Sequence, residues 1–357
     1  MRSLEIAGQK IAAGETRDVQ LKFSESYLGS SVTVPIRVIR AKKDGPTMFI
    51  TGAIHGDELT GVGIIRELLY DRPPDIRHGT LICLPVVNTY GFENQSRYLP
   101  DRRDLNRSFP GFQEGSPSSR LAYYIFNEVV AKCDFGLDFH SAAVRRTNYP
   151  NIRADMKNPQ VRALARAFGC ELIVNSKGPS GSLRRTAVRK GIPTLILEAG
   201  EVWKFEPGVV EIGVIGSINL MRKMGMLEGE VQKPIFQVTI DKTTWVRASR
   251  GGFLGFHAKP GDFVSKDQEL ATNTSIFGRE RNVITSPVNG IVLGMTTMPA
   301  VKPGEPIYHI AVMAEKTMTR IRKQMEKSSE STYYRRIQEA LSTNITLLER
   351  QNHVETE

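Results

Sequence analysis

Residues 48–58 read MFITGAIHGDE, an apolar run followed by a turn of small and polar residues. From here to about residue 224, strand-like apolar runs alternate with segments whose apolar residues recur at helical spacing. Further predicted strands are 80–86, 135–139, 172–174 and 194–197. The predicted helices are 61–70, 118–132, 159–168 and 209–224. This alternation predicts an α/β fold, with a mixed, mostly parallel sheet that carries helices on both faces.

Different patterns flank this α/β region. Residues 1–45 alternate short apolar and polar runs, which predicts an N-terminal β-rich segment. Short strand-like runs separated by Gly- and Pro-containing turns fill 234–315, which predicts a small all-β C-terminal domain. This domain is similar to lipoyl- or biotinyl-type domains but lacks their attachment hairpin. Residues 316–357 are polar and helix-prone, and we expect a helical tail there. The α/β domain would then occupy 46–233.

The composition is that of an ordinary globular protein, with 40% apolar and 24% charged residues among 357. No apolar run approaches the roughly 18 residues that a membrane-spanning helix needs. Charged residues interrupt the segment Met1–Lys10, so we expect no secretory signal. Three widely spaced cysteines, Cys83, Cys133 and Cys170, do not suggest a disulfide framework. These features together predict a cytoplasmic protein.

The net charge of +10 is concentrated in one segment. Eleven basic residues and two acidic ones lie between Arg145 and Lys190, so this segment carries +9. It could be a solvated face, or it could create a positive field around a site for an anionic small molecule. Nucleic-acid binding is a third reading, but the aromatic residues of a stacking platform are missing. We therefore expect no nucleic-acid partner.

Three chemically active residues follow predicted strands. His55 lies just after the strand that starts at Met48, while His140 and Glu198 directly follow the strands 135–139 and 194–197. Ligands bind in open α/β sheets beyond the carboxyl ends of the strands. If these strands are neighbours, we expect the three side chains to converge.

A metal site is one explanation for two of these residues. His55 and Glu58 are three apart at a turn, a spacing from which an imidazole and a carboxylate can reach one ion. His140 would be a third ligand and would leave one position open, as in catalytic zinc sites. Alternatively, His55 and Glu58 have a surface or capping role, and His140 is a hydrogen-bonded core residue.

Glu198 and an arginine-rich loop offer further chemistry. A carboxylate at a strand end could act as a general base, although a salt bridge to a nearby arginine is the simpler alternative. Residues 97–107 read RYLPDRRDLNR and could form a substrate clamp, because arginine recognises carboxylates with two parallel hydrogen bonds. Alternatively, this is an exposed loop. Asp104 could instead orient a metal-bound imidazole.

The order of these motifs resembles the succinylglutamate desuccinylase/aspartoacylase family, a branch of the zinc carboxypeptidase-like fold. The resemblance runs from about Met48 to Gly200. It rests on the motifs His55-x-x-Glu58, Asp104-Leu105-Asn106-Arg107, Asp138-Phe139-His140 and Glu198.

This resemblance implies roles for individual residues. The implied ligands of one Zn²⁺ per chain are His55, Glu58 and His140. Glu198 would be the general base and acid, and Arg97 would polarise the scissile carbonyl. Asn106 and Arg107 would hold a substrate carboxylate. Residues 46–233 would be a zinc-dependent catalytic domain.

The predicted function is zinc-dependent hydrolysis of the amide bond of a small N-acylated amino acid or related amide, which releases a carboxylate. We expect a small anionic N-acyl substrate and no membrane partner, and a homo-oligomer is left open. The alternatives are a metallopeptidase of the carboxypeptidase type and a non-catalytic binding module.

Overall fold

A computed structural model describes residues 4–278 and 281–327. The chain forms two compact units. The first consists of Met1–Ala142 and Pro150–Thr239, and the second of Ala143–Tyr149 and the chain from Ile240 onward. The domain boundaries expected from the sequence stay a prediction.

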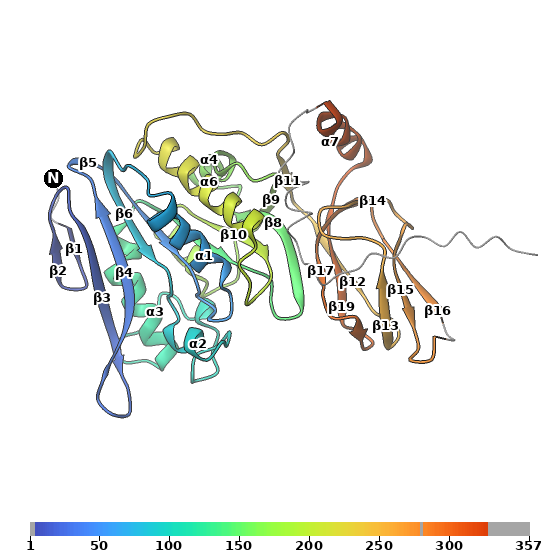
Figure 1. Ribbon diagram of the computed structural model, residues 1–357, viewed down its shortest axis with the longest axis horizontal. Helices are drawn as coiled ribbons and strands as arrows, with labels where there is room; N and C mark the ends of the chain where they lie inside the picture. Colours follow the sequence, from blue (N-terminus) through green and yellow to red (C-terminus); the bar gives the residue numbers. More distant parts are fainter. Residues whose placement is uncertain (1–3, 279–280, 328–357) are drawn as a thin grey trace, which may run out of the picture. The chain divides into compact units, whose positions relative to one another are not determined.

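A mixed sheet forms the centre of the first unit (Figure 1). Its strands, in spatial order, are β3 (Thr16–Glu25), β4 (Ser31–Arg40), β6 (His78–Leu84), β5 (Lys43–Thr51), β7 (Phe135–His140), β10 (Thr194–Gly200) and β8 (Arg146–Ala154). β6, β5, β7 and β10 run parallel, whereas β3 and β4 add an antiparallel edge. β9 (Leu172–Asn175) pairs in parallel with β8, and β1 (Leu4–Ile6) and β2 (Gln9–Ile11) form a separate hairpin. The predicted mixed, mostly parallel sheet is confirmed.

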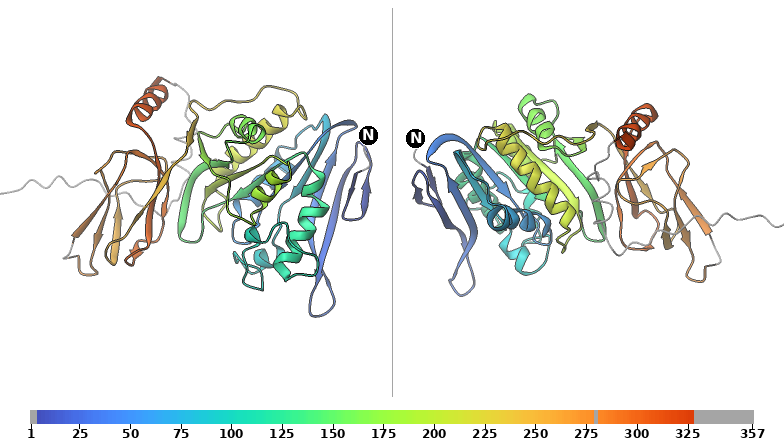
Figure 2. Two further views of the ribbon diagram at one scale, coloured as in Figure 1. Left: turned by 180° about the vertical axis from the view of Figure 1, so that it is seen from behind. Right: turned by 45° about the horizontal axis from the view of Figure 1, so that its top comes forward.

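Helices cover both faces of this sheet, as Figure 2 shows from two further directions. On one face α1 (Thr60–Arg66) packs against α6 (Pro207–Lys223), which also contacts α4 (Pro159–Phe168). On the other face α3 (Pro117–Glu128) and α5 (Leu183–Arg189) share a core with β3, β4 and β6. The shorter helical elements are η1 (Glu67–Asp71), α2 (Thr89–Glu93), η2 (Leu105–Arg107) and η3 (Val130–Lys132).

Local sequence signals set the ends of α4. The side chain of Asn158 accepts hydrogen bonds from the backbone N–H groups of Gln160 and Val161, so it caps the helix as its sequence position predicts. Gly169 then ends the helix with φ of 89°, a conformation that costs glycine little.

Antiparallel strands dominate the second unit, which confirms the predicted all-β character. One group consists of β12 (Thr243–Arg247), β19 (Pro306–Val312), β17 (Gly290–Thr296) and β14 (Phe263–Val264), and residues Arg146–Asn148 pair with β17. The other consists of β16 (Arg281–Thr285), β15 (Glu269–Thr274), β13 (Gly252–Phe256) and β18 (Ala300–Val301). The chain passes from the first unit to the second within β11 (Val238–Ile240).

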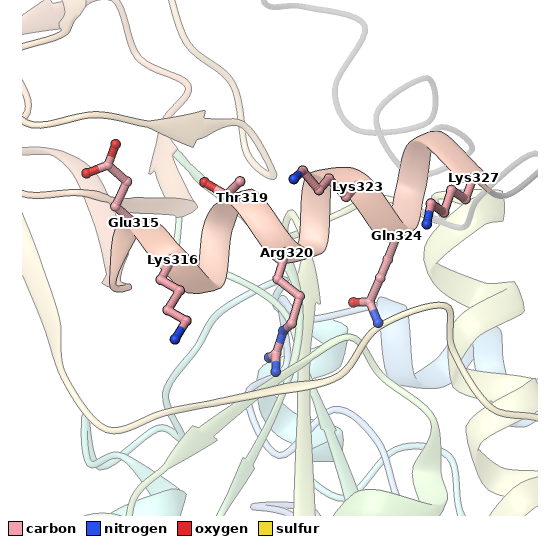
Figure 3. A pocket seen from close by; sticks show the side chains of 7 residues that line it. All are labelled: Glu315, Lys316, Thr319, Arg320, Lys323, Gln324 and Lys327. Atoms are coloured by element: carbon pink, nitrogen blue, oxygen red, sulfur yellow. The ribbon is translucent and has the colours of Figure 1, made fainter.

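The helix α7 (Glu315–Lys327) follows the last strand and buries Met318 and Ile321. Seven of its residues line a pocket, four of them basic (Figure 3). No histidine or aromatic residue contributes to this lining, so the pocket offers no evident catalytic set. The apolar helical pattern at the end of the expected tail, residues 337–348, lies outside the described residues. Among the described residues, every helix is too short or too polar to span a bilayer.

Of the elements that lie near the site, β8 and α5 were not predicted from the sequence. β8 carries basic and amide residues and Pro150 without regular alternation, so its strand conformation depends on pairing with its neighbours. α5 is a seven-residue helix in which four residues are Arg or Thr. β8 contributes side chains to the site, and α5 contributes the backbone N–H of Leu183.

Candidate metal centre

The sheet brings the three strand-end residues together. In the register of β7 and β10, Glu198 lies opposite His140, and Thr51 at the end of β5 lies opposite Asp138. His55 follows β5 in a tight turn in which the N–H of Glu58 donates to the carbonyl of His55. Gly56 is needed in this turn, because a Cβ there would lie 1.9 Å from the carbonyl carbon of Gly91.

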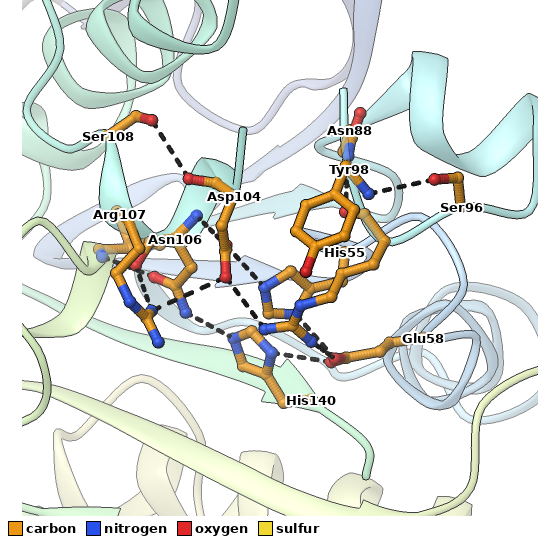
Figure 4. Close-up of polar contacts among 12 residues, drawn as sticks. His55, Glu58, Asn88, Ser96, Tyr98, Asp104, Asn106, Arg107, Ser108 and His140 are labelled. Atoms are coloured by element: carbon orange, nitrogen blue, oxygen red, sulfur yellow. Dashed lines mark hydrogen bonds and ion pairs between the residues drawn. The ribbon is translucent and has the colours of Figure 1, made fainter. Parts of the chain in front are cut away.

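Three buried side chains meet at this end of the sheet (Figure 4). His55, Glu58 and His140 each place a potential ligand atom within 4.8 Å of the other two. The Nδ1 atoms of His55 and His140 lie 2.7 and 2.8 Å from the two carboxylate oxygens of Glu58. No other group of three such ligands occurs within residues 4–278 and 281–327. The group can therefore hold a metal ion, as expected from the sequence.

Outer carboxylates orient both imidazoles. Nε2 of His55 lies 3.0 Å from Asp104, and Nε2 of His140 lies 2.9 Å from Asp138. The hydroxyl of Thr51 donates to the other oxygen of Asp138 over 2.8 Å. If each Nε2 carries the proton that it donates to its carboxylate, each Nδ1 lone pair is directed at the shared position. This arrangement fits a divalent cation.

The surroundings of Glu58 favour its ionised form. Burial by itself would raise the pKa of Glu58, but the attraction of the His55 and His140 imidazoles is stronger and holds that pKa well below its usual range. Burial would likewise lower the pKa of His140, yet Asp138 and Glu58 raise it well above its ordinary value. The two imidazoles and the carboxylate of Glu58 thus favour one another's charged forms.

Arg97 lies beside the ligand group. Its guanidinium donates to Glu58 over 3.1 Å and to Asp104 over 3.1 Å. Burial lowers the pKa of Arg97, but the carboxylates of Glu58 and Asp104 outweigh burial and raise it. Arg103, by contrast, donates to Ser116 and is exposed. Of these two arginines of the 97–107 loop, Arg97 is the one in contact with a candidate ligand.

Asn106 and Arg107 are held by the short turn η2. Asp104 caps this turn by accepting from the N–H of Asn106 over 2.8 Å. The amide oxygen of Asn106 accepts from the backbone N–H of Leu183 at the start of α5, 2.9 Å away. Nδ2 of Asn106 therefore remains as a donor, 3.4 Å from Nε2 of His140. The side chain of Arg107 is half exposed.

Two residues of β8 contact Glu198. Its Oε1 atom lies 3.4 Å from the guanidinium of Arg153, and its backbone carbonyl accepts from the side chain of Asn151 over 3.2 Å. The salt bridge that the sequence left open for Glu198 is therefore present. A pairing of this length with a partly exposed arginine does not exclude a role in proton transfer.

Comparisons with known proteins identify the family. Residues 44–224 match the model of the succinylglutamate desuccinylase/aspartoacylase catalytic domain. The chain belongs to the succinylglutamate desuccinylase/aspartoacylase family. The family resemblance inferred from the sequence is thus confirmed, and the chain is a deacylase-type enzyme and not merely a binding module.

Individual relatives of this family resemble the chain over most of its length. An N-alpha-acetyl-L-2,4-diaminobutyric acid deacetylase from Halomonas elongata is 31% identical over 259 residues, which are 69% of this chain and 75% of that protein. The product-bound ectoine utilization protein EutE (DoeB) from Ruegeria pomeroyi is 26% identical with a TM-score of 0.75, over 84% of this chain and 95% of that one. A family member from Rhodobacter sphaeroides is 26% identical with a TM-score of 0.70, over 83% and 94% of the two chains.

The contribution of β8 to the site could not be predicted from the sequence alone. Asn151 and Arg153 were visible only as part of a long basic and polar stretch. Residues 151 and 153 are two apart, so in a strand they point to the same face. This spacing could have indicated that the two side chains act together. It becomes informative only when the segment is known to be a strand next to β10.

Proposed function

We propose that this enzyme hydrolyses the amide bond of a small N-acylated amino acid with the help of one Zn²⁺ per chain. The buried His55–Glu58–His140 group is the observation that carries this proposal. Its two imidazoles and one carboxylate match the donor set of catalytic zinc sites. The relative that deacetylates N-acetylated diaminobutyric acid supports an N-acyl amino acid as the substrate class.

His55, Glu58 and His140 would hold the Zn²⁺, which when bound supplies Lewis acidity that polarises the amide carbonyl and lowers the pKa of water. Glu198 would accept a proton from the attacking water and then deliver it to the leaving nitrogen as the C–N bond breaks. Arg97 would stabilise the negative charge that develops on the carbonyl oxygen. Water supplies both the oxygen of the released carboxylate and the proton of the released amine, so the reaction is balanced.

Asn106 and Arg107 would bind the α-carboxylate of the substrate. The amide orientation of Asn106 supports this role, because the Leu183 N–H engages its oxygen and leaves Nδ2 to donate. The Arg107 guanidinium is half exposed, and one of its terminal nitrogens donates to the backbone carbonyl of Asn106 over 2.7 Å, so the rest of the group can reach a ligand. We also propose a cytoplasmic location, which is supported by three free cysteine thiols.

A substrate panel tests the proposed function. We expect the zinc-loaded protein to release free amine from at least one N-acetyl, N-succinyl or N-formyl L-amino acid, as measured by an amine-reactive dye. Unblocked dipeptides in the same panel test for a peptidase of the carboxypeptidase type. Cleavage of dipeptides without cleavage of any N-acyl amino acid would contradict the proposal.

The buried carboxylate of Asp138 gives a prediction about the metal itself. We expect Asp138→Asn to weaken Zn²⁺ binding about 10- to 100-fold, because the outer carboxylate keeps His140 oriented and basic. Competition with a chromogenic chelator measures this affinity without an activity assay. Asp75→Asn is a matched control, since Asp75 is exposed and pairs with Arg77. Equal affinities of the two variants would refute this role of Asp138.

A further inference from the structure

The strand β3 ends the sheet of the first unit on one side (Figure 1). It is ten residues long, and among the described residues its one strand partner is β4. We propose that a second copy of this chain pairs with β3 in antiparallel orientation, so that the sheet continues across a twofold axis into a dimer. The proposed deacylase function is not needed for this pairing.

Every second residue of β3 directs its backbone polar groups away from β4. The carbonyl of Glu15, directly before the strand, accepts from the N–H of Arg40 at the end of β4 over 2.9 Å. Residues of an antiparallel pair alternate between those that bond to the partner strand and those that do not. Up to the bulge after Lys22, the odd-numbered residues of β3 therefore bond to β4. The even-numbered residues direct their N–H and C=O groups to the open edge, where another strand can bind; these residues are Thr16, Asp18, Gln20 and Lys22.

The opposite edge of the β3–β4 hairpin is less suited to pairing. Within the described chain β4 pairs with β6 only from Arg37 to Arg40, so the earlier part of β4 also has an open side. The N–H of Ala41 donates to the β6 side of the strand, so the odd-numbered residues of β4 face that side. Pro35 is one of them and has no N–H to donate. The free edge of β3 carries a donor at each outward position.

The exposed side chains of β3 are complementary to their own copy in antiparallel orientation. Asp18 and Lys22 lie at equal distances on either side of Gln20, and their side chains are 61% and 53% exposed. If Gln20 of one copy lies opposite Gln20 of the other, each Asp18 lies opposite Lys22 of the second copy. Opposite charges directly across two strands stabilise their pairing. This register also brings outward-facing backbone groups of both strands together.

Other registers of the same edge place charges less favourably. Pairing centred on Asp18 or on Lys22 puts two like charges opposite each other, which destabilises the pair of strands. Asp18 already accepts from Arg37 through both carboxylate oxygens, and Lys22 pairs with Glu25, but both side chains stay more than half exposed. Charged residues on an edge strand usually prevent association with another chain. Here their signs and spacing favour one register of self-association.

Apolar side chains at the tip of the β3–β4 hairpin offer a second contact. The tip extends beyond the neighbouring strands (Figure 1), and Tyr27 is fully exposed while Leu28 is 93% exposed. A register centred on Gln20 brings this tip close to the turn before β3 of the second copy. Ala12 and Ala13 of that turn are exposed. Contact between the tip and this turn removes apolar surface from water and thus favours the dimer.

The mass of the full chain in solution is the first test. We expect light scattering after size exclusion to give twice the mass of one chain. A cysteine at Gln20 then tests the register, because the Cα atoms of a hydrogen-bonded pair lie about 5.5 Å apart, within the range of a disulfide. We expect Gln20→Cys to form a covalent dimer under mild oxidation. Thr16→Cys is the matched control, since Thr16 is exposed on the same strand but does not lie opposite its own copy. The native cysteines are buried and should not interfere.

Charge substitutions test the complementarity of the two edges. Asp18→Lys and Lys22→Asp each place like charges opposite each other twice per dimer, so we expect either variant to raise the dissociation constant about 10-fold in sedimentation velocity. In an equimolar mixture of the two variants every lysine at these positions lies opposite an aspartate. The mixture should therefore associate about as tightly as the wild type. Loss of the Arg37 ion pair within one chain could not be repaired by mixing. Lys157→Asp, at an exposed position outside β3, controls for the change in net charge.

Three results would overturn the inference. The wild type could have the mass of one chain at every concentration measured. Gln20→Cys could crosslink no faster than Thr16→Cys, which would place any dimer contact elsewhere. The mixture of Asp18→Lys and Lys22→Asp could associate no more tightly than either variant alone, provided that circular dichroism shows both variants to be folded. If one of them is unfolded, the crosslinking result decides.

Discussion

Replacing Glu198 by glutamine is expected to lower kcat about 10²- to 10⁴-fold, the usual contribution of a general acid–base group. Glutamine has nearly the same shape but cannot accept the proton of the attacking water or return it to the leaving nitrogen. The backbone hydrogen bond from Asn151 to the carbonyl of residue 198 is unaffected by this change. Turnover of an N-acyl substrate under saturating conditions measures the effect.

A loss of turnover in Glu198→Gln identifies Glu198 as the general base only if the variant keeps its metal and its fold. We therefore expect Glu198→Gln to bind Zn²⁺ like the wild type in elemental analysis and to give the same circular dichroism spectrum. Glu128→Gln is a suitable control, since Glu128 lies on α3 and pairs with Lys132 at the surface. A turnover number of Glu198→Gln within about threefold of the wild type would exclude Glu198 as the base.

Replacing His140 by alanine is expected to remove the metal and, with it, nearly all activity. The remaining His55 and Glu58 would supply two protein ligands, whereas catalytic zinc sites have three. Elemental analysis of the purified variant should find less than about a tenth of an ion per chain. Full zinc occupancy would show that His140 is not a ligand.

Loss of His140 also has a cost for the fold. Its imidazole pairs with the buried carboxylates of Asp138 and Glu58, and breaking such a buried pair costs about 3–5 kcal/mol of folding free energy.

Chelator treatment of the wild type tests the metal requirement without this loss of stability. We expect activity to be lost on chelation and regained when Zn²⁺ is added, and activity that persists in metal-free protein would contradict the zinc-dependent mechanism.

The α/β architecture and the residues at the centre of the candidate site could be predicted from the sequence alone. Alternating helical and strand periods identified the α/β class, because these periods depend on which face of each element is buried. His55 and His140 could be expected to meet, because parallel strands expose their carboxyl ends at one edge of a sheet. The family resemblance followed from the same short motifs.

Only the tertiary structure showed which other residues lie beside His55 and His140 in the candidate site. In the sequence only the family resemblance singled out Arg97 from its neighbours in the loop, and the structure places it against Glu58 and Asp104. Nothing in the sequence indicated that the Leu183 N–H fixes the amide of Asn106. Arg153 was one of eleven basic residues until β8 placed it 3.4 Å from Glu198. The hydrogen bond between Asn106 and Leu183 joins residues that are 77 positions apart. Such contacts depend on strand order and on the packing of loops, and local periodicity contains no information about either.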